Sequence, residues 1–145
     1  MAEILYREVY DVERGSFDTA GEASSKIKRT LKKMGIAPAI LREAAIVSYE
    51  LELNLVIHSL GGTLTLEIEP DMLRIRSADR GPGIQNIALA MTEGYSTASE
   101  EVRSMGFGAG MGLPNVKRHS HSFSIRSEVG EGTVIEANYL LDRRD

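Results

Sequence analysis

The sequence predicts an α+β domain, a two-layer sandwich in which a mixed, mostly antiparallel sheet is covered on one face by about three helices. Two segments alternate apolar and polar residues around short turns, which is typical of β-hairpins. Two longer segments before the first hairpin place apolar residues at helical spacing. Because strands pair with their neighbours in sequence and few helices cross between them, this class is favoured over a parallel sheet.

The N-terminal part predicts a strand followed by a helix. Residues 3–10 mix Ile, Leu, Tyr and Val with charged residues and suit a strand. Thr19 followed by Glu22 has the pattern of a capping box, so a helix is expected to start there. Apolar residues at helical spacing continue it to the lysines at 32–33. Gly35 can then adopt the left-handed conformation that often ends a helix.

A second and longer helix is followed by a hairpin. Pro38 fits the first turn of this helix, which is expected to run to about His58 and to end at Gly61-Gly62. Residues 63–77 then alternate apolar and polar side chains around Glu69-Pro70-Asp71, as in a β-hairpin. The apolar face of the hairpin needs a cover, which the two helices can supply.

Residues 79–112 are rich in glycine and predict little regular structure beyond a helical stretch around 84–91. A long irregular segment inside a compact domain is usually a functional lid or is disordered. A short helix is expected from about Gly112 to about His119, and two strands, at 122–127 and 133–141, follow it. A turn at 129–132 joins these last two strands.

Composition limits the class of protein. The chain has 145 residues and a formal net charge of −4, so one domain spanning residues 1–145 is expected, and the acidic balance argues against a nucleic-acid partner. It has no cysteine, which excludes disulfides, thiolate metal sites and a cysteine nucleophile. No apolar run approaches the length of a membrane span, and the first residues do not resemble a signal peptide. We therefore expect a cytoplasmic protein with no membrane association.

The second helix places three polar residues on one face. Glu50, Asn54 and His58 are spaced four residues apart, so they lie along one side of the helix. Such a stripe is often only a solvated helix face. It can also face a pocket, where the Asn54 carbonyl would be a ligand for Mg²⁺ and the Glu50 carboxylate would accept a proton.

Two further glycine motifs follow strands of the hairpins. The sequence Asp79-Arg80-Gly81-Pro82-Gly83 is ordinary turn chemistry after a strand, but it could also place a carboxylate where it accepts a hydrogen bond from the amine of a nucleobase. The sequence Gly130-Glu131-Gly132-Thr133 is, by itself, a hairpin turn.

The segment from Gly106 to Leu113 has glycine at every second position and leads into a helix. It is neither a dinucleotide-binding fingerprint nor a Walker A loop. Backbone N–H groups in such a segment can bind phosphates, although a mobile surface loop is the plainer alternative. His119 and His121 form a pair that could bind zinc, but no carboxylate or cysteine lies near them in sequence.

The order of these motifs resembles the N, G1, G2 and G3 boxes of the GHKL ATPase superfamily. Within it, the chain is most similar to the small serine/threonine kinases of bacterial anti-sigma-factor and stressosome systems. The similarity covers about residues 15–140 and rests on four stretches: residues 49–54 (YELELN), 79–84 (DRGPGI), 93–97 (EGYST) and 112–118 (GLPNVKR). The resemblance implies the Bergerat ATP-binding fold.

The resemblance also implies roles for single residues. Glu50 matches the general base of the kinases and Asn54 the Mg²⁺ ligand. Asp79 matches the acceptor of the adenine amine, with Gly81 and Gly83 beside the base and Thr133 near it. A lid at about 92–112 would lie near the phosphates, and its matching residues are Gly106, Gly108, Gly110, Met111, Gly112 and Leu113.

The function implied is Mg-dependent transfer of the γ-phosphoryl group of ATP to a Ser or Thr of a partner protein of the anti-sigma-antagonist type. A sigma factor or a phosphatase as a further partner, and a homodimer, stay open. The main alternative is a non-catalytic regulator that binds ATP and sequesters a protein. A detached histidine-kinase domain, a gyrase-type ATPase and a binding module without a nucleotide are weaker alternatives.

Overall fold

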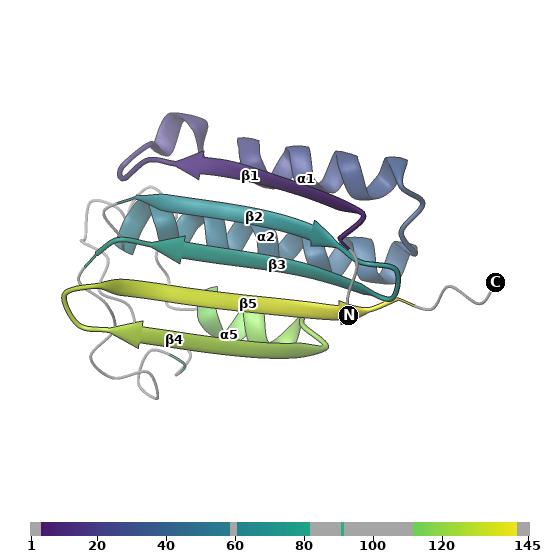
Figure 1. The fold of residues 1–145 in the computed structure, drawn as a ribbon. Helices are drawn as coiled ribbons and strands as arrows, with labels where there is room; N and C mark the ends of the chain where they lie inside the picture. The colour runs from purple at the N-terminus through teal and green to yellow at the C-terminus, as the bar shows by residue number, and fades with distance from the viewer. Residues whose placement is uncertain (1–3, 59–60, 82–90, 92–111, 142–145) are drawn as a thin grey trace.

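The computed structural model has two layers, a five-stranded sheet and a layer of helices on one of its faces (Figure 1). It describes residues 4–58, 61–81, 91 and 112–141. The strands are β1 (Tyr6–Val12), β2 (Gly62–Ile68), β3 (Met72–Asp79), β4 (Ser122–Glu128) and β5 (Gly132–Leu140). The helices are the 3₁₀ turn η1 (Phe17–Thr19) and the α-helices α1 (Glu22–Lys33), α2 (Pro38–His58) and α5 (Gly112–Arg118).

The sheet order is β1-β2-β3-β5-β4, and each of these four pairings is antiparallel. The α+β class is therefore confirmed, and the described part of the sheet is wholly antiparallel rather than mixed. The two predicted hairpins are present as β2–β3 and β4–β5. Pairing of β3 with β5 joins them, which brings the C-terminal end of β3 beside the start of β5.

The core lies between the sheet and the helices. Leu64, Leu66 and Ile68 of β2 and Leu73 and Ile75 of β3 are fully buried on the inner face, as the alternation predicted. The helix layer meets them with apolar residues of α1 and α2, among them Ile27, Leu31, Val47, Leu51 and Leu55. Burial of this continuous face fixes the register of the sheet, because a slip of one residue would turn the face outward.

The outer face of the sheet is polar and is crossed by a row of charges. Arg74 lies 3.1 Å from Glu67 and 3.2 Å from Glu136, and Arg7 lies 3.4 Å from Glu67. Glu67 is nearly buried, with 8% of its side chain exposed, so these cross-strand pairs compensate its desolvation. The row links β1, β2, β3 and β5 on the face opposite the helices.

The predicted capping box at the start of α1 is wrong. Thr19 belongs to η1, where its hydroxyl donates to the carbonyl of Ser16, and the N-cap residue of α1 is Gly21. Gly21 has no side chain to accept a hydrogen bond. Instead the buried carboxylate of Glu52 on α2 accepts from the backbone N–H groups of Ala23 and Ser24, at 3.2 and 3.0 Å. A residue distant in sequence therefore caps the helix.

The other predicted elements agree with the structure within a few residues. Helix α2 runs from Pro38 to His58, and Gly35 has the left-handed φ of 76° expected after α1. The stretch predicted to be helical around 84–91 lies outside the described residues, except Met91, as does most of the predicted lid at 92–112.

Candidate functional site

Helix α2 holds Glu50 and Asn54 one turn apart on the same side. Both are half-buried, whereas Leu51 and Leu55 next to them are buried in the core. The helix is anchored by those leucines, so the two polar side chains are held at a fixed position on its surface. His58 is the last residue of α2, and its side chain lies outside the described part of the structure.

Glu50 lies near α5, the helix that follows the glycine-rich segment. Burial raises the pKa of the Glu50 carboxyl group, and hydrogen bonding by the nearby side chain of Asn115 on α5 opposes the increase. The Asn115 carbonyl oxygen in turn accepts from Nη1 of Arg118, at 3.0 Å. Sequence reasoning did not single out Asn115, because no spacing rule connects α5 to α2.

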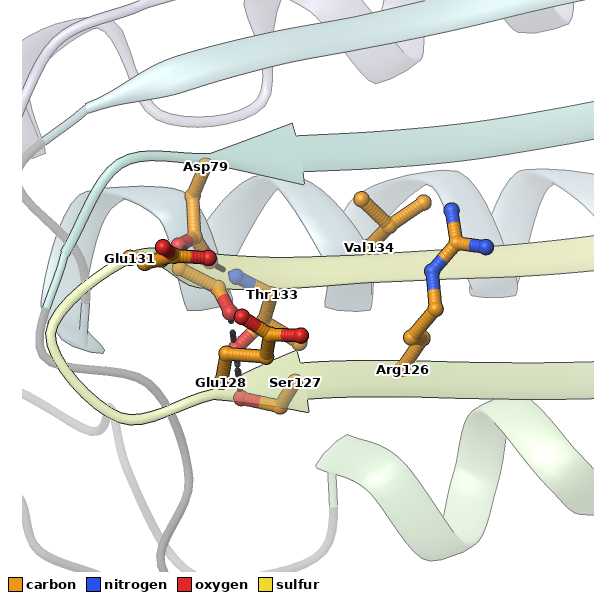
Figure 2. Close-up of a pocket in the computed structure, with 8 residues that line it drawn as sticks. Asp79, Arg126, Ser127, Glu128, Glu131, Thr133 and Val134 are labelled. Atoms are coloured by element: carbon orange, nitrogen blue, oxygen red, sulfur yellow. Dashed lines mark hydrogen bonds between the residues drawn. The ribbon is translucent and has the colours of Figure 1, made fainter.

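Asp79 is the last residue of β3 and lies beside the start of β5. Its Oδ1 accepts the backbone N–H of Thr133 at 3.0 Å, as the dashed line in Figure 2 shows. Burial raises the pKa of the Asp79 carboxyl group, and the bond from Thr133 acts against that increase. The structure therefore brings together two of the predicted site residues that are far apart in sequence.

Thr133 is connected to β4 as well. Its hydroxyl lies 2.8 Å from the hydroxyl of Ser127, and the Ser127 hydroxyl also donates to the carbonyl of Gly132 at 3.2 Å (Figure 2). Thr133 is buried, with 5% of its surface exposed. Ser127 was not predicted, but its register opposite Thr133 follows once the β4–β5 hairpin is in place.

Gly132 does more than form a turn. It has a φ of 139°, and a Cβ added there would overlap the backbone carbonyl of Asp79. Only glycine allows this close approach without a shift of the backbone. The hairpin turn that looked unremarkable in the sequence thus sets the packing of Asp79 against β5.

A shallow cavity of about 240 Å³ lies at this end of the sheet. Figure 2 shows its lining side chains, which come from the end of β3 and from the β4–β5 hairpin. Asp79 and Thr133 are among them, together with Arg126, Ser127, Glu128, Glu131, Gly132 and Val134. Glu50 and Asn54 do not line this cavity. The predicted site residues therefore form two groups, one on α2 and one at the β3–β5 junction.

The predicted glycines are described only in part. Gly81 is buried after β3, and Gly112 is the first residue of α5. Leu113 is half-buried and packs against the hydrophobic core, so its side chain has a packing role. Gly83, Gly106, Gly108, Gly110 and Met111 lie outside the described residues.

The histidine pair lies in the connection between α5 and β4 and contacts residues of β5. Nδ1 of His121 accepts the backbone N–H of Leu140 at 2.9 Å, and its ring meets that of Tyr139 edge to face at 5.2 Å. The Tyr139 hydroxyl donates to the carbonyl of His119. Within the described ranges, no cluster of three or more His, Asp or Glu residues could hold a metal ion by itself. The same part of the chain contains no helix that could cross a membrane.

Comparisons with known proteins show the family and the fold of the chain. Residues 42–143 match the model of the histidine kinase-, DNA gyrase B-, and HSP90-like ATPase family. The chain is 32% identical over 114 residues to the serine/threonine-protein kinase RsbT of Bacillus subtilis (strain 168). This match covers 76% of the chain and 80% of RsbT. A chain of the SiaB–SiaC complex from Pseudomonas aeruginosa has the same fold, with a TM-score of 0.63 at 13% identity. That match covers 94% of this chain and 89% of the other.

Proposed function

Because the chain belongs to the histidine kinase-, DNA gyrase B-, and HSP90-like ATPase family, we propose that it is an ATP-dependent serine/threonine protein kinase. Its acceptor is a Ser or Thr of a regulatory protein of the anti-sigma-antagonist type, in a partner-switching pathway. The similarity to RsbT, over most of both chains, supports the reaction. The observation that supports it in this chain is the half-buried pair Glu50 and Asn54 on one side of α2.

The junction of β3 and β5 fits the adenine end of ATP. Oδ1 of Asp79 accepts the Thr133 N–H, so the second carboxylate oxygen of Asp79 can accept a hydrogen bond from an exocyclic amine. The bond from Thr133 fixes the orientation of the carboxylate, and the missing side chain of Gly132 lets the two strands approach. Gly81 and Gly83 follow Asp79 in the sequence and would allow the backbone to pass close to the base.

The phosphate groups of the nucleotide would lie beside α2. Asn54 offers a carbonyl oxygen, a ligand that Mg²⁺ accepts together with phosphate oxygens and water. When bound, Mg²⁺ would neutralise charge on the phosphates during transfer. We assign Gly106, Gly108, Gly110, Met111, Gly112 and Leu113 to the segment near the phosphates, with Leu113 contributing through its backbone.

Glu50 is the group that would accept the proton of the attacking hydroxyl. In the transfer, the acceptor oxygen forms a bond to the γ-phosphorus while the bond to the β,γ-bridging oxygen breaks and ADP leaves. The hydroxyl proton moves to the Glu50 carboxylate. Burial of Glu50 makes the carboxylate a better proton acceptor, because its pKa is raised. The protein contributes mainly position and charge, as phosphoryl transfer requires.

The direct test mixes the protein with Mg-ATP labelled at the γ-phosphate and with each anti-sigma-antagonist-type protein of its own genome. Label on a Ser or Thr of one of them supports the proposal. Tight complexes that depend on ATP but give no label would support the alternative, a non-catalytic regulator that sequesters its partner. Calorimetry with Mg-ATP is the control, since no binding heat and no thermal shift would exclude both functions.

A further inference from the structure

Helix α2 has apolar side chains on its outer side as well as on the side that faces the core. Ile46, Tyr49 and Leu53 are spaced three and four residues apart, so they form one apolar strip along the helix. Ile46 and Leu53 are half-buried, and Tyr49 is 39% exposed. Within the described part of the chain, none of the three belongs to the hydrophobic core or packs against it. The outer side of a surface helix is normally polar, so packing of the core does not account for this strip.

The apolar strip lies in the middle of the helix layer and beside Glu50. Helix α2 is between α1 and α5 and contacts both of them (Figure 1). Glu50 follows Ile46 by four residues and precedes Leu53 by three, so it is a direct neighbour of both on the helix surface. Glu43 lies one more step along the same border, seven residues before Glu50. A protein segment that lies on the strip therefore reaches the carboxylate to which we assign the role of base.

The other border of the strip is basic. Gly21 at the start of α1 lies against Tyr49, since a Cβ added to Gly21 would be 3.6 Å from Cε1 of the tyrosine ring. Lys28 and Lys32 follow Gly21 by seven and eleven residues, so they lie on the same side of α1, and both are exposed. Arg42 of α2 is seven residues before Tyr49 and is exposed as well. Cations therefore line this border, although the chain as a whole has a net charge of −4.

We propose that the apolar strip is the docking site for the acceptor protein. An apolar segment beside the receiving Ser or Thr lies on the strip, and acidic side chains of the acceptor face Lys28, Lys32 and Arg42. Exposed apolar patches with a polar rim mark protein–protein interaction sites, and tyrosine is a frequent source of their binding energy. This inference rests on the proposed kinase function. The acceptor is the occupant because it must bring a hydroxyl group to the neighbouring Glu50.

The variants Tyr49→Ala and Leu53→Ala test the apolar contact. The acceptor in the assay is the anti-sigma-antagonist-type protein that takes label from the wild type. At saturating Mg-ATP, each variant should raise the KM for this protein by about fivefold to thirtyfold. The kcat and the calorimetric affinity for ATP should change little, because the strip does not contact the nucleotide in this scheme. Leu5→Ala is the matched control, since it makes the same change in a leucine that is 52% exposed just before β1, and it should leave the KM unchanged.

The double variant Lys28→Glu/Lys32→Glu tests the basic border. We expect the KM for the acceptor protein to rise by about tenfold at low ionic strength and by less at high ionic strength, because salt screens exposed charges. The matched control is Lys26→Glu/Lys33→Glu. It makes the same change in charge on the same helix and also replaces one lysine of the last turn. By spacing, these two exposed lysines lie on a different side of α1, so the KM should stay near that of the wild type.

The outcomes separate the docking role from the kinase function. An unchanged KM in Tyr49→Ala and Leu53→Ala would overturn the docking role while the kinase function stands. The same holds if these variants lose ATP affinity instead, or if they dissociate a dimer of the wild type in light scattering, since the strip would then serve the nucleotide or a second copy. Equal KM values for the two lysine pairs would overturn the acidic chemistry assigned to the acceptor. Binding of Mg-ATP by the wild type without transfer to any acceptor protein would instead contradict the proposed function, and with it this inference.

Discussion

Glu52 is a buried carboxylate on α2 that caps α1, and its replacement should destabilise the fold by a measurable amount. Only 2% of its surface is exposed. It accepts from the N–H groups of Ala23 and Ser24, the second and third residues of α1. An N-cap side chain normally accepts from these N–H groups, but the N-cap residue Gly21 has no side chain that could do so.

The size of the effect follows from these two bonds. In Glu52→Leu both N–H groups lose their acceptor, and each such loss costs about 1–3 kcal/mol. Both groups are buried, so we expect a total of about 2–6 kcal/mol. Glu52→Gln keeps one acceptor oxygen and should cost about 1–2 kcal/mol. For a chain of this length 1 kcal/mol corresponds to roughly 3 °C, so Glu52→Leu should melt roughly 6–18 °C lower.

The assay is urea unfolding followed by far-ultraviolet circular dichroism, with thermal melts in parallel. Glu13→Gln is the matched control, because Glu13 is exposed shortly before η1 and its side chain takes part in no cap or ion pair among the described residues. The control should stay within about 0.5 kcal/mol of the wild type. If Glu52→Leu unfolded at the same urea concentration as the wild type, the capping role of Glu52 would be refuted.

Three further changes test the remaining contacts. Asp79→Asn should weaken ATP binding by about tenfold to a hundredfold in calorimetry, since a hydrogen bond to a charged acceptor is lost. Burial raises the pKa of Asp79, so above that raised pKa the ionised carboxyl group opposes folding. The melting temperature of Asp79→Asn at neutral pH should therefore be unchanged or higher than that of the wild type. A lower melting temperature would show that the ionised carboxylate stabilises the fold. Gly132→Ala should cost more stability and ATP affinity than Gly130→Ala, because both glycines have positive φ but only the new Cβ at 132 would overlap Asp79; equal effects would show that the overlap is relieved. Arg74→Met should lower the free energy of unfolding by about 2 kcal/mol, because it leaves the nearly buried Glu67 with Arg7 alone, whereas Arg76→Met on the same strand face should cost far less; denaturant titration measures both.

Local patterns in the sequence predicted most of the fold. The alternation in 63–77 identified the β2–β3 hairpin with its buried leucines, and helical spacing identified α2 from Pro38 to His58. These elements depend on a periodic apolar face, which a sequence displays directly. The pairing of β3 with β5 has no such local signal, because it joins the two hairpins across the whole glycine-rich segment.

The candidate site was predictable where its residues lie on one element. Glu50 and Asn54 share one side of a helix by spacing alone, and their position on α2 agrees with that expectation. Contacts between elements could not be predicted. The bond from Thr133 to Asp79 and the cap from Glu52 to α1 both join residues at least 28 positions apart.

The incorrect prediction at Thr19 has the same cause. The capping-box pattern is a local signal, but α1 has Gly21 as its N-cap, two residues after Thr19, and Glu52 accepts from the N–H groups of Ala23 and Ser24 instead. The only sign of that contact in the sequence is the carboxylate of Glu52 between two leucines in residues 51–55.

The most direct test of the central claim is single-turnover transfer of labelled γ-phosphate from Mg-ATP to the acceptor protein by the wild type and by Glu50→Gln. Glutamine keeps the shape of the side chain but is a far weaker base. We predict unchanged ATP affinity with transfer reduced by about 10²–10⁴-fold. Transfer by Glu50→Gln at the wild-type rate would contradict the assignment of Glu50 as the base.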